Sequence, residues 1–211
     1  MKSSKMPART NIIKKALRGI SKAQKDYEAW STLWLWEAPE YMTTTYIAKE
    51  IAPDSYYVTL EQNAGESTEA GGGVGKGNVG ERMRRKLKRG KFDIVVWKGD
   101  DTPIVIIEVK KQPVRFNQIS GDVDNICRVL KGKNLRYGLI AYYLGLVQKT
   151  ADEPAEVRTS RIVEEIRVDA DAHIKRKRGL KLRQHLSHPK PQVVEDSAWI
   201  GVVLQISKSS Q

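Results

Sequence analysis

Two short apolar segments joined by a polar link constrain the fold of this chain more than any other feature of its sequence. Residues 92–97 and 104–110 are rich in β-branched side chains, as strands are. Between them lies a link that contains glycine and aspartate, residues that favour turns: Lys98-Gly99-Asp100-Asp101-Thr102-Pro103. The pattern therefore predicts a β-hairpin.

Hydrophobic patterning predicts a mixed α/β chain around this hairpin. Helices are predicted over residues 12–34, 39–51, 118–130 and 153–168, and strands over residues 56–60, 135–144 and 198–206. A basic stretch at residues 173–188 is compatible with a further helix. The glycine-rich segment 71–77 departs from the phosphate-binding loop motif at both ends, so it is interpreted as an ordinary loop.

The composition indicates one domain with a basic surface. The chain has 211 residues, of which 37 are basic and 25 acidic, for a formal charge of +12. This length suits a single domain, and the positive charge favours a polyanionic partner, most commonly nucleic acid. A single cysteine, Cys127, excludes an intrachain disulfide, and no apolar run approaches the length of a membrane span. The basic N-terminus is not followed by the apolar block of a secretory signal, so a cytoplasmic location is expected.

The predicted hairpin carries charged residues among its apolar ones. Alternate residues of a strand share a face, so Asp93 should lie on the same face as Val95, with Phe92 on the opposite face. In the second strand, Glu108 and Lys110 share a face for the same reason. The two strands therefore carry three charged side chains on an otherwise apolar framework.

The expected register of the hairpin places two acidic residues opposite each other. If the turn is centred between Asp100 and Asp101, Asp93 lies across from Glu108, with their Cβ atoms about 5 Å apart. Like charges in that position are destabilising unless something lies between them. Two such carboxylates suit a hard cation such as Mg²⁺, and Lys110 on the same face could hold a water or a phosphate oxygen.

The spacing of these residues is similar to that of a known nuclease signature. Asp93, then fourteen intervening residues, then Glu108-Val109-Lys110 resembles the motif of the PD-(D/E)XK nuclease superfamily, which has the restriction-endonuclease-like fold. The resemblance covers roughly residues 39–144, where the predicted order of helix, strand, strand, strand, helix and strand is that of the family's αβββαβ core. One departure is Phe92, which stands where the family motif has proline.

The resemblance implies a mixed central β-sheet flanked by helices. One nuclease domain would span residues 1–211, with its core at about residues 39–144. Residues 1–38 would form an N-terminal helical arm. Residues 150–211 would form a basic C-terminal extension with helices and a last strand.

The resemblance also implies roles for individual residues. Asp93, Glu108 and the backbone carbonyl of Val109 would bind Mg²⁺, for which Mn²⁺ could substitute. Lys110 would orient or activate the attacking water. A further glutamate often comes from the preceding helix in this family, and we expect it to be one of three residues, with the first favoured: Glu40, Glu37 or Glu50.

The activity implied by the resemblance is Mg²⁺-dependent hydrolysis of phosphodiester bonds in DNA, in the manner of an endonuclease. DNA is then the expected partner, and a homodimer is among the assemblies left open. One alternative is a nucleic-acid-binding protein that has the same fold without catalysis. Another is a junction-resolving or RNA-cleaving relative, because a fold does not determine its substrate.

Two basic clusters are candidates for contacts with the DNA backbone, since phosphate contacts need lysine and arginine near the site. The first precedes the motif and comprises Arg82, Arg84, Arg85, Lys88, Arg89 and Lys91. The second comprises Lys175, Arg176, Lys177 and Arg178. Arg128 is a further candidate, although its spacing from Asp124 predicts an i, i+4 ion pair on a helix surface.

Overall fold

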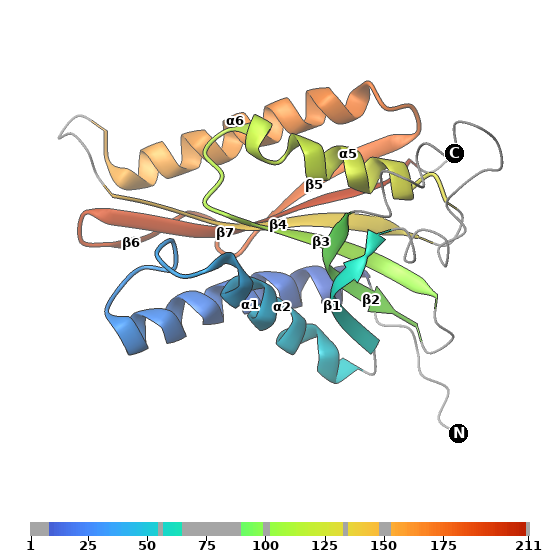
Figure 1. Cartoon of the computed structure of the whole chain (residues 1–211). Helices are drawn as coiled ribbons and strands as arrows, with labels where there is room; N and C mark the ends of the chain where they lie inside the picture. Colours follow the sequence, from blue (N-terminus) through green and yellow to red (C-terminus); the bar gives the residue numbers. More distant parts are fainter. Residues whose placement is uncertain are drawn as a thin grey trace.

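The computed structural model of the chain describes residues 9–54, 57–64, 90–98, 102–132, 135–147 and 153–209. Over these ranges the chain has a mixed α/β fold, with a central sheet flanked by helices (Figure 1). Its four α-helices there are α1 (Arg9–Ser31), α2 (Glu40–Ile51), α5 (Ser120–Val129) and α6 (Ala155–Lys175), and short 3₁₀ helices lie at Ala52–Asp54 and Phe116–Gln118. Within the same ranges, no helix combines the length and the apolar character that crossing a membrane requires.

Within the described ranges the sheet has seven strands, and the second strand of the predicted hairpin also belongs to a parallel pair. In chain order the strands are β1 (Tyr57–Asn63), β2 (Lys91–Trp97), β3 (Pro103–Lys111), β4 (Tyr137–Val147), β5 (Leu180–Leu186), β6 (Gln192–Val194) and β7 (Ser197–Lys208). Their order across the sheet is β1-β2-β3-β4-β7-β5, and β6 also pairs with β7. Strands β3 and β4 are parallel, and the other described pairs are antiparallel. Helix α5 lies in the crossover that a parallel pair requires.

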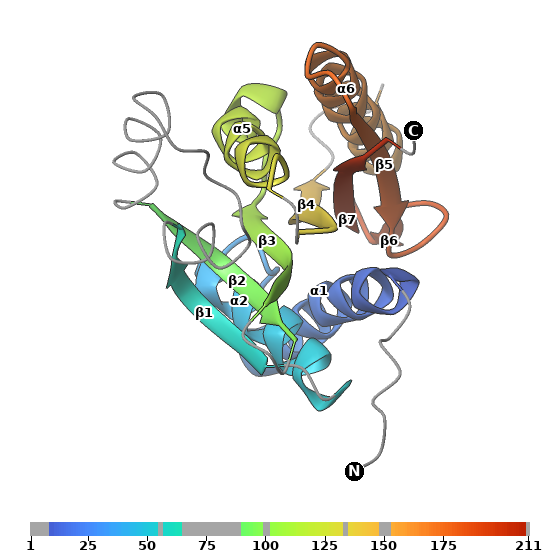
Figure 2. The ribbon, with the colours of Figure 1, turned by 90° about the vertical axis from the view of Figure 1, so that its right-hand side faces the viewer.

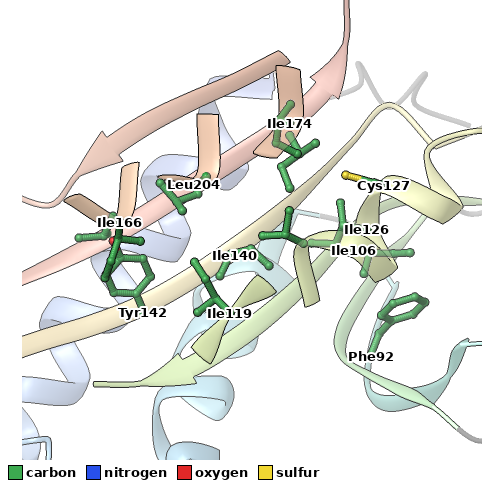
Figure 3. Close-up of a cluster of buried hydrophobic side chains, with 14 of the residues drawn as sticks. Phe92, Ile106, Ile119, Ile126, Cys127, Ile140, Tyr142, Ile166, Ile174 and Leu204 are labelled. Atoms are coloured by element: carbon green, nitrogen blue, oxygen red, sulfur yellow. The ribbon is translucent and has the colours of Figure 1, made fainter. Parts of the chain in front are cut away.

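Helices cover both faces of the sheet, and each face has its own apolar core. Helices α1 and α2 lie on one face, and α5 and α6 lie on the other (Figure 2). The core beneath α5 and α6 includes the buried side chains of Ile126, Ile140 and Leu204 (Figure 3). The core on the opposite face includes Ile20 and Ile107. Because successive side chains of a strand point to opposite faces, the central strands supply both cores and are buried on both sides.

Several predicted elements are confirmed. Helix α2 occupies the predicted range 39–51 apart from its first residue, and β2 and β3 form the predicted antiparallel hairpin. The predicted strand 135–144 lies mostly in β4, and the predicted strand 198–206 lies wholly in β7. The helix predicted over residues 153–168 is α6, which continues to Lys175.

The helix considered for the basic stretch 173–188 is wrong. Helix α6 ends at Lys175, and β5 follows it after a turn at Gly179, whose φ of 78° is a conformation that glycine adopts readily. Leucines at positions 180 and 182 alternate with basic residues along β5, and β5 pairs with β7. A strand alternation was therefore present in the sequence, but the density of lysine and arginine obscured it.

Segments outside the predicted core belong to the same layers. Ile13, Ala16 and Ile20 of α1 are buried in the core that α1 and α2 share with the sheet. Strand β7 pairs with β4 from Ser197 to Ser207. The segments predicted as an arm and an extension thus supply a helix and a central strand to the fold.

A close contact between α5 and β4 fixes the height of α5 above the sheet. Gly138 of β4 lies beneath Ile126 of α5, and a Cβ atom at residue 138 would be 2.3 Å from Ile126 Cγ2. That distance is far shorter than any van der Waals contact, so a side chain at this position would push α5 away. The glycine therefore positions α5, whose first turn lies at the candidate site.

We expect Gly138→Ala to destabilise the protein by about 1–3 kcal/mol, because overpacking a filled core forces side chains or backbone to shift. The matched control is Gly121→Ala in α5, where a Cβ atom would meet no other atom within 4 Å. The control should be stabilised by about 0.5–1 kcal/mol, because alanine loses less backbone entropy in a helix. Chemical denaturation measures both changes, and a neutral Gly138→Ala would contradict the close α5–β4 contact.

Candidate active site

The hairpin has the predicted register, which brings its two acidic residues together. Ile94 pairs with Ile107, so the next residues toward the open end of the hairpin are Asp93 and Glu108. The regular pairing ends at Ile94, and the Oδ2 atom of Asp93 accepts a hydrogen bond from the Val109 N–H at 2.7 Å. The Asp93 carboxylate therefore continues the ladder in place of a backbone carbonyl, and it lies within hydrogen-bonding reach of the Glu108 carboxyl group.

The alternation predicted for β2 is wrong at Phe92. Phe92 and Val95 are predicted on opposite faces, but both are buried in the core beneath α5 and α6, where Figure 3 labels Phe92. On the neighbouring strand, Glu61 has a φ of 48°, and the regular pairing of β1 with β2 is interrupted at this residue. Such an irregularity twists the strand locally, here beside Asp93.

Glu108 is a carboxyl group in an environment that disfavours its charge. Its side chain is buried, with 4% of the residue exposed. Burial, the Asp93 carboxylate and the charge of Asp122 raise its pKa from 4.5 to about 9, and the charge of Lys110 opposes the rise only in part. Without a bound cation, Glu108 is therefore protonated at neutral pH, and a negative charge on it needs compensation.

Lys110 is held by an acidic residue that was not predicted. Its Nζ atom lies 3.2 Å from Oδ2 of Asp122, in the first turn of α5. Burial by itself lowers the pKa of Lys110, but Asp122, Glu40 and Asp93 outweigh burial and raise it. Lys110 is thus an ammonium group at neutral pH. The sequence signal for Asp122 is an acid in the first turn of the helix predicted after the motif.

Of the three candidate helix acids, Glu40 is the one that lies at the site. Its Oε2 atom accepts a hydrogen bond from the Lys111 N–H at 2.6 Å, and its charge acts on Lys110. Glu50 is buried near the other end of α2 and pairs with two basic side chains of α1. Glu37 is exposed and precedes the helix. Glu40 therefore lies beside the motif, and its role as the helix acid of the site stays a prediction.

The oxygen atoms at the hairpin suit a hard cation. Among the residues that the structure describes, no three histidine, cysteine, aspartate or glutamate side chains form a cluster that could hold a metal ion. Mg²⁺, however, is usually bound through one or two carboxylates and takes its other ligands from water and phosphate. The adjacent carboxyl groups of Asp93 and Glu108 meet that requirement, and the Val109 carbonyl remains a predicted third donor.

The first predicted basic cluster is only partly described. Five of its members lie outside the described residues: Arg82, Arg84, Arg85, Lys88 and Arg89. The glycine-rich segment 71–77 also lies outside them. Lys91, the last member, begins β2 and forms an exposed ion pair with Glu61 at 2.9 Å. The role of this cluster in binding the DNA backbone therefore remains a prediction.

The second predicted cluster meets Arg128 at a pocket away from the hairpin. Arg128, Arg176, Lys177 and Arg178 line this pocket. Lys175 instead forms an i, i+4 ion pair with Asp171, at 2.7 Å. Residues from α5 and from the end of α6 are therefore brought together, whereas Lys175 is directed elsewhere.

The predicted ion pair between Asp124 and Arg128 is wrong. Asp124 Oδ1 lies 2.8 Å from His173 Nε2 and 2.9 Å from Lys177 Nζ, both from the α6 segment. Arg128 instead donates a hydrogen bond to the side-chain oxygen of Asn125 at 2.6 Å. Because α6 packs beside α5, the partners of Asp124 come from the α6 segment and not from its own helix.

No family model, no curated protein and no solved structure matches the chain. Function is therefore inferred from the residues of the site themselves.

We expect Glu108→Gln to stabilise the metal-free protein at alkaline pH. Between pH 4.5 and about 9 the folded wild type binds a proton at Glu108 that the unfolded chain has released, so its stability falls as the pH rises through this range. Glutamine cannot titrate, so the gain at pH 8 should exceed about 1.4 kcal/mol, the equivalent of one pKa unit. Below pH 4.5 the free energies of unfolding of the two proteins should converge.

Thermal melts in EDTA at a series of pH values measure this effect. Glu37→Gln, at an exposed position before α2, is the control and should leave the pH dependence unchanged. The same pH dependence in Glu108→Gln and wild type would show that Glu108 is not held in the disfavoured environment described here.

Proposed function

We propose that this chain is a Mg²⁺-dependent nuclease of the PD-(D/E)XK type that hydrolyses phosphodiester bonds in DNA, as an endonuclease. One observation carries the proposal: the carboxyl groups of Asp93 and Glu108 meet at the open end of the β2–β3 hairpin, two residues from Lys110. Two adjacent carboxylates, one of them buried, are unfavourable in a metal-free protein. A cation-binding role explains why the chain contains them.

The order of elements around the hairpin supports the proposal. Helix α2, strands β1, β2 and β3, helix α5 and strand β4 follow one another as in an αβββαβ restriction-endonuclease-like core. The four strands are also neighbours in the sheet in this order. Glu108 and Lys110 lie at the carboxyl end of β3, and in α/β sheets ligands bind beyond the carboxyl ends of parallel strands.

The acidic pair would hold the metal. Asp93 and Glu108 would provide carboxylate ligands, together with the carbonyl of Val109. When bound, Mg²⁺ supplies a Lewis acid that polarises the phosphate and lowers the pKa of a coordinated water. The Val109 N–H bond to Asp93 fixes the orientation of that carboxylate before any ligand arrives.

Lys110 would act on the reacting groups as a fixed positive charge. Because its pKa is raised, it donates hydrogen bonds to the attacking water or to a phosphate oxygen and does not take up a proton. Asp122 limits the positions that its ammonium group can reach. Glu40 supports the same region through the Lys111 backbone and through its charge.

Cleavage of supercoiled plasmid, a four-way junction and RNA, each with Mg²⁺, Mn²⁺ or EDTA, tests the proposal. Wild type should cut DNA with the divalent cations and not in EDTA, and Asp93→Asn should be inactive. Lys110→Ala should lose about 10²–10⁴-fold in turnover while still binding DNA, since it removes one positioned catalytic group. Lys49→Ala, on the exposed side of α2, is the control and should cut at the wild-type rate.

The outcomes separate the alternatives. Cleavage by wild type in excess EDTA would refute the metal-dependent mechanism. DNA binding without any cleavage, unchanged by Lys110→Ala, would identify a non-catalytic binding protein of the same fold. Preferential cutting of the junction or of RNA would assign one of the related nuclease activities in place of general DNA cleavage.

Asp122 gives a separate test of how Lys110 is positioned. We expect Asp122→Asn to lower kcat by about 10-fold or more with little change in KM, because it releases the ammonium group without touching the substrate. The control is Asp124→Asn, two residues away on the same helix, which disturbs the α5–α6 contact and not Lys110. Equal losses in both variants would mean that Asp122 acts only through the packing of α5.

A further inference from the structure

A basic pocket lies where α5 and α6 end, at a distance from the acidic pair. Its volume is about 670 Å³, which is within the range of small-ligand sites. Figure 1 shows that α5 and α6 run in the same direction and end beside the C-terminal part of β7. Leu130, Cys127 and Leu180 form apolar parts of the wall, and the remaining lining is mostly basic.

The positive charges around this pocket exceed its negative charges. Arg128, Lys131, Arg176 and Arg178 line the pocket, and within the described ranges none of them forms an ion pair with an acidic side chain. The acid of the lining, Asp124, is already shared by His173 and Lys177. Like charges gathered around a concave wall repel one another, and the field that they create concentrates anions.

Helix capping does not account for this number of basic residues. Basic side chains in the last turn of a helix are favourable because the C-terminus carries a partial negative charge. Arg128 lies in the last turn of α5 and Arg176 is the C-cap residue of α6, but Lys131 and Arg178 lie beyond the two caps and Lys208 ends β7. The positive charge has gathered at the pocket from three separate elements.

The same helix connects this pocket to the candidate active site. Asp122 at the start of α5 holds Lys110, and Arg128 near its end lines the pocket. Six residues of α-helix span about 9 Å. A single DNA strand that crosses this length could therefore reach both the hairpin and the pocket.

We propose that the basic pocket binds a backbone phosphate of the same DNA strand whose bond is cut at the hairpin. The proposal rests on the proposed nuclease function for its choice of DNA as the ligand. The pocket would anchor the substrate by charge, and the hairpin residues would carry out the chemistry.

Binding of a short fluorescent DNA duplex in EDTA, over a series of salt concentrations, tests the pocket without any cleavage. The test variant is Arg176→Ser with Arg178→Ser, two exposed residues whose loss should leave the fold intact. The matched control removes two exposed lysines from the opposite face, Lys14→Ser with Lys49→Ser. We expect the test variant to bind roughly tenfold more weakly at low salt, with a salt slope shallower by about 0.9 for each lost phosphate contact.

The results distinguish failure of the pocket from failure of the nuclease proposal. Equal binding by the test and control variants would overturn the pocket, even if wild type cuts DNA in Mg²⁺. Selective weakening in the test variant would support the pocket, even if no cleavage is found. Saturable binding of a free mononucleotide or of inorganic phosphate, with DNA affinity unchanged in the test variant, would overturn DNA as the occupant and assign a free phosphate ligand.

Discussion

The contact between Asp93 and Glu108 at the end of the β2–β3 ladder is the constraint on which the rest of the site depends. Neither carboxyl group can easily move away from the other. Asp93 is fixed because it takes the Val109 N–H as a backbone acceptor would, and Glu108 is fixed because its strand is buried on both faces. The repulsion is therefore built into the sheet. A proton relieves it in the metal-free protein, and the proposed cation would relieve it in the same way.

The rest of the site is assembled by helices from both faces of the sheet. Glu40 begins α2 on one face and binds the Lys111 N–H, and Asp122 lies in the first turn of α5 on the other face and binds Lys110. The packing of α5 depends on Gly138, where the absence of a side chain lets the helix approach β4. A contact in the core thus determines where the Lys110 ammonium group is held.

The local part of this arrangement could be predicted from sequence, and the part that depends on packing could not. Turn residues and strand alternation determine the hairpin, so its register and the meeting of Asp93 with Glu108 followed from spacing alone. Asp122 was missed because no local pattern indicates how α5 is rotated above the sheet. Asp124 and Arg128 were wrongly paired for the same reason, since α6 brings Lys177 and His173 closer to Asp124. The basic residues of β5 concealed a strand, although only the ten residues 187–196 separate it from its partner β7.

The first turn of α5 lies among acidic residues and its last turn among basic ones. This separation of charge would affect how a polyanion binds. Repulsion from the acids near Asp122 and attraction by the residues near Arg128 would act on phosphates about 9 Å apart. The Debye length at physiological ionic strength is about 8 Å, so each end acts mainly on the phosphate nearest to it. An anchoring charge closer to the hairpin would instead neutralise Asp93 and Glu108 and weaken their affinity for a cation. In the proposed complex, separation along the helix would let the pocket hold DNA while the acidic pair stayed free for the metal.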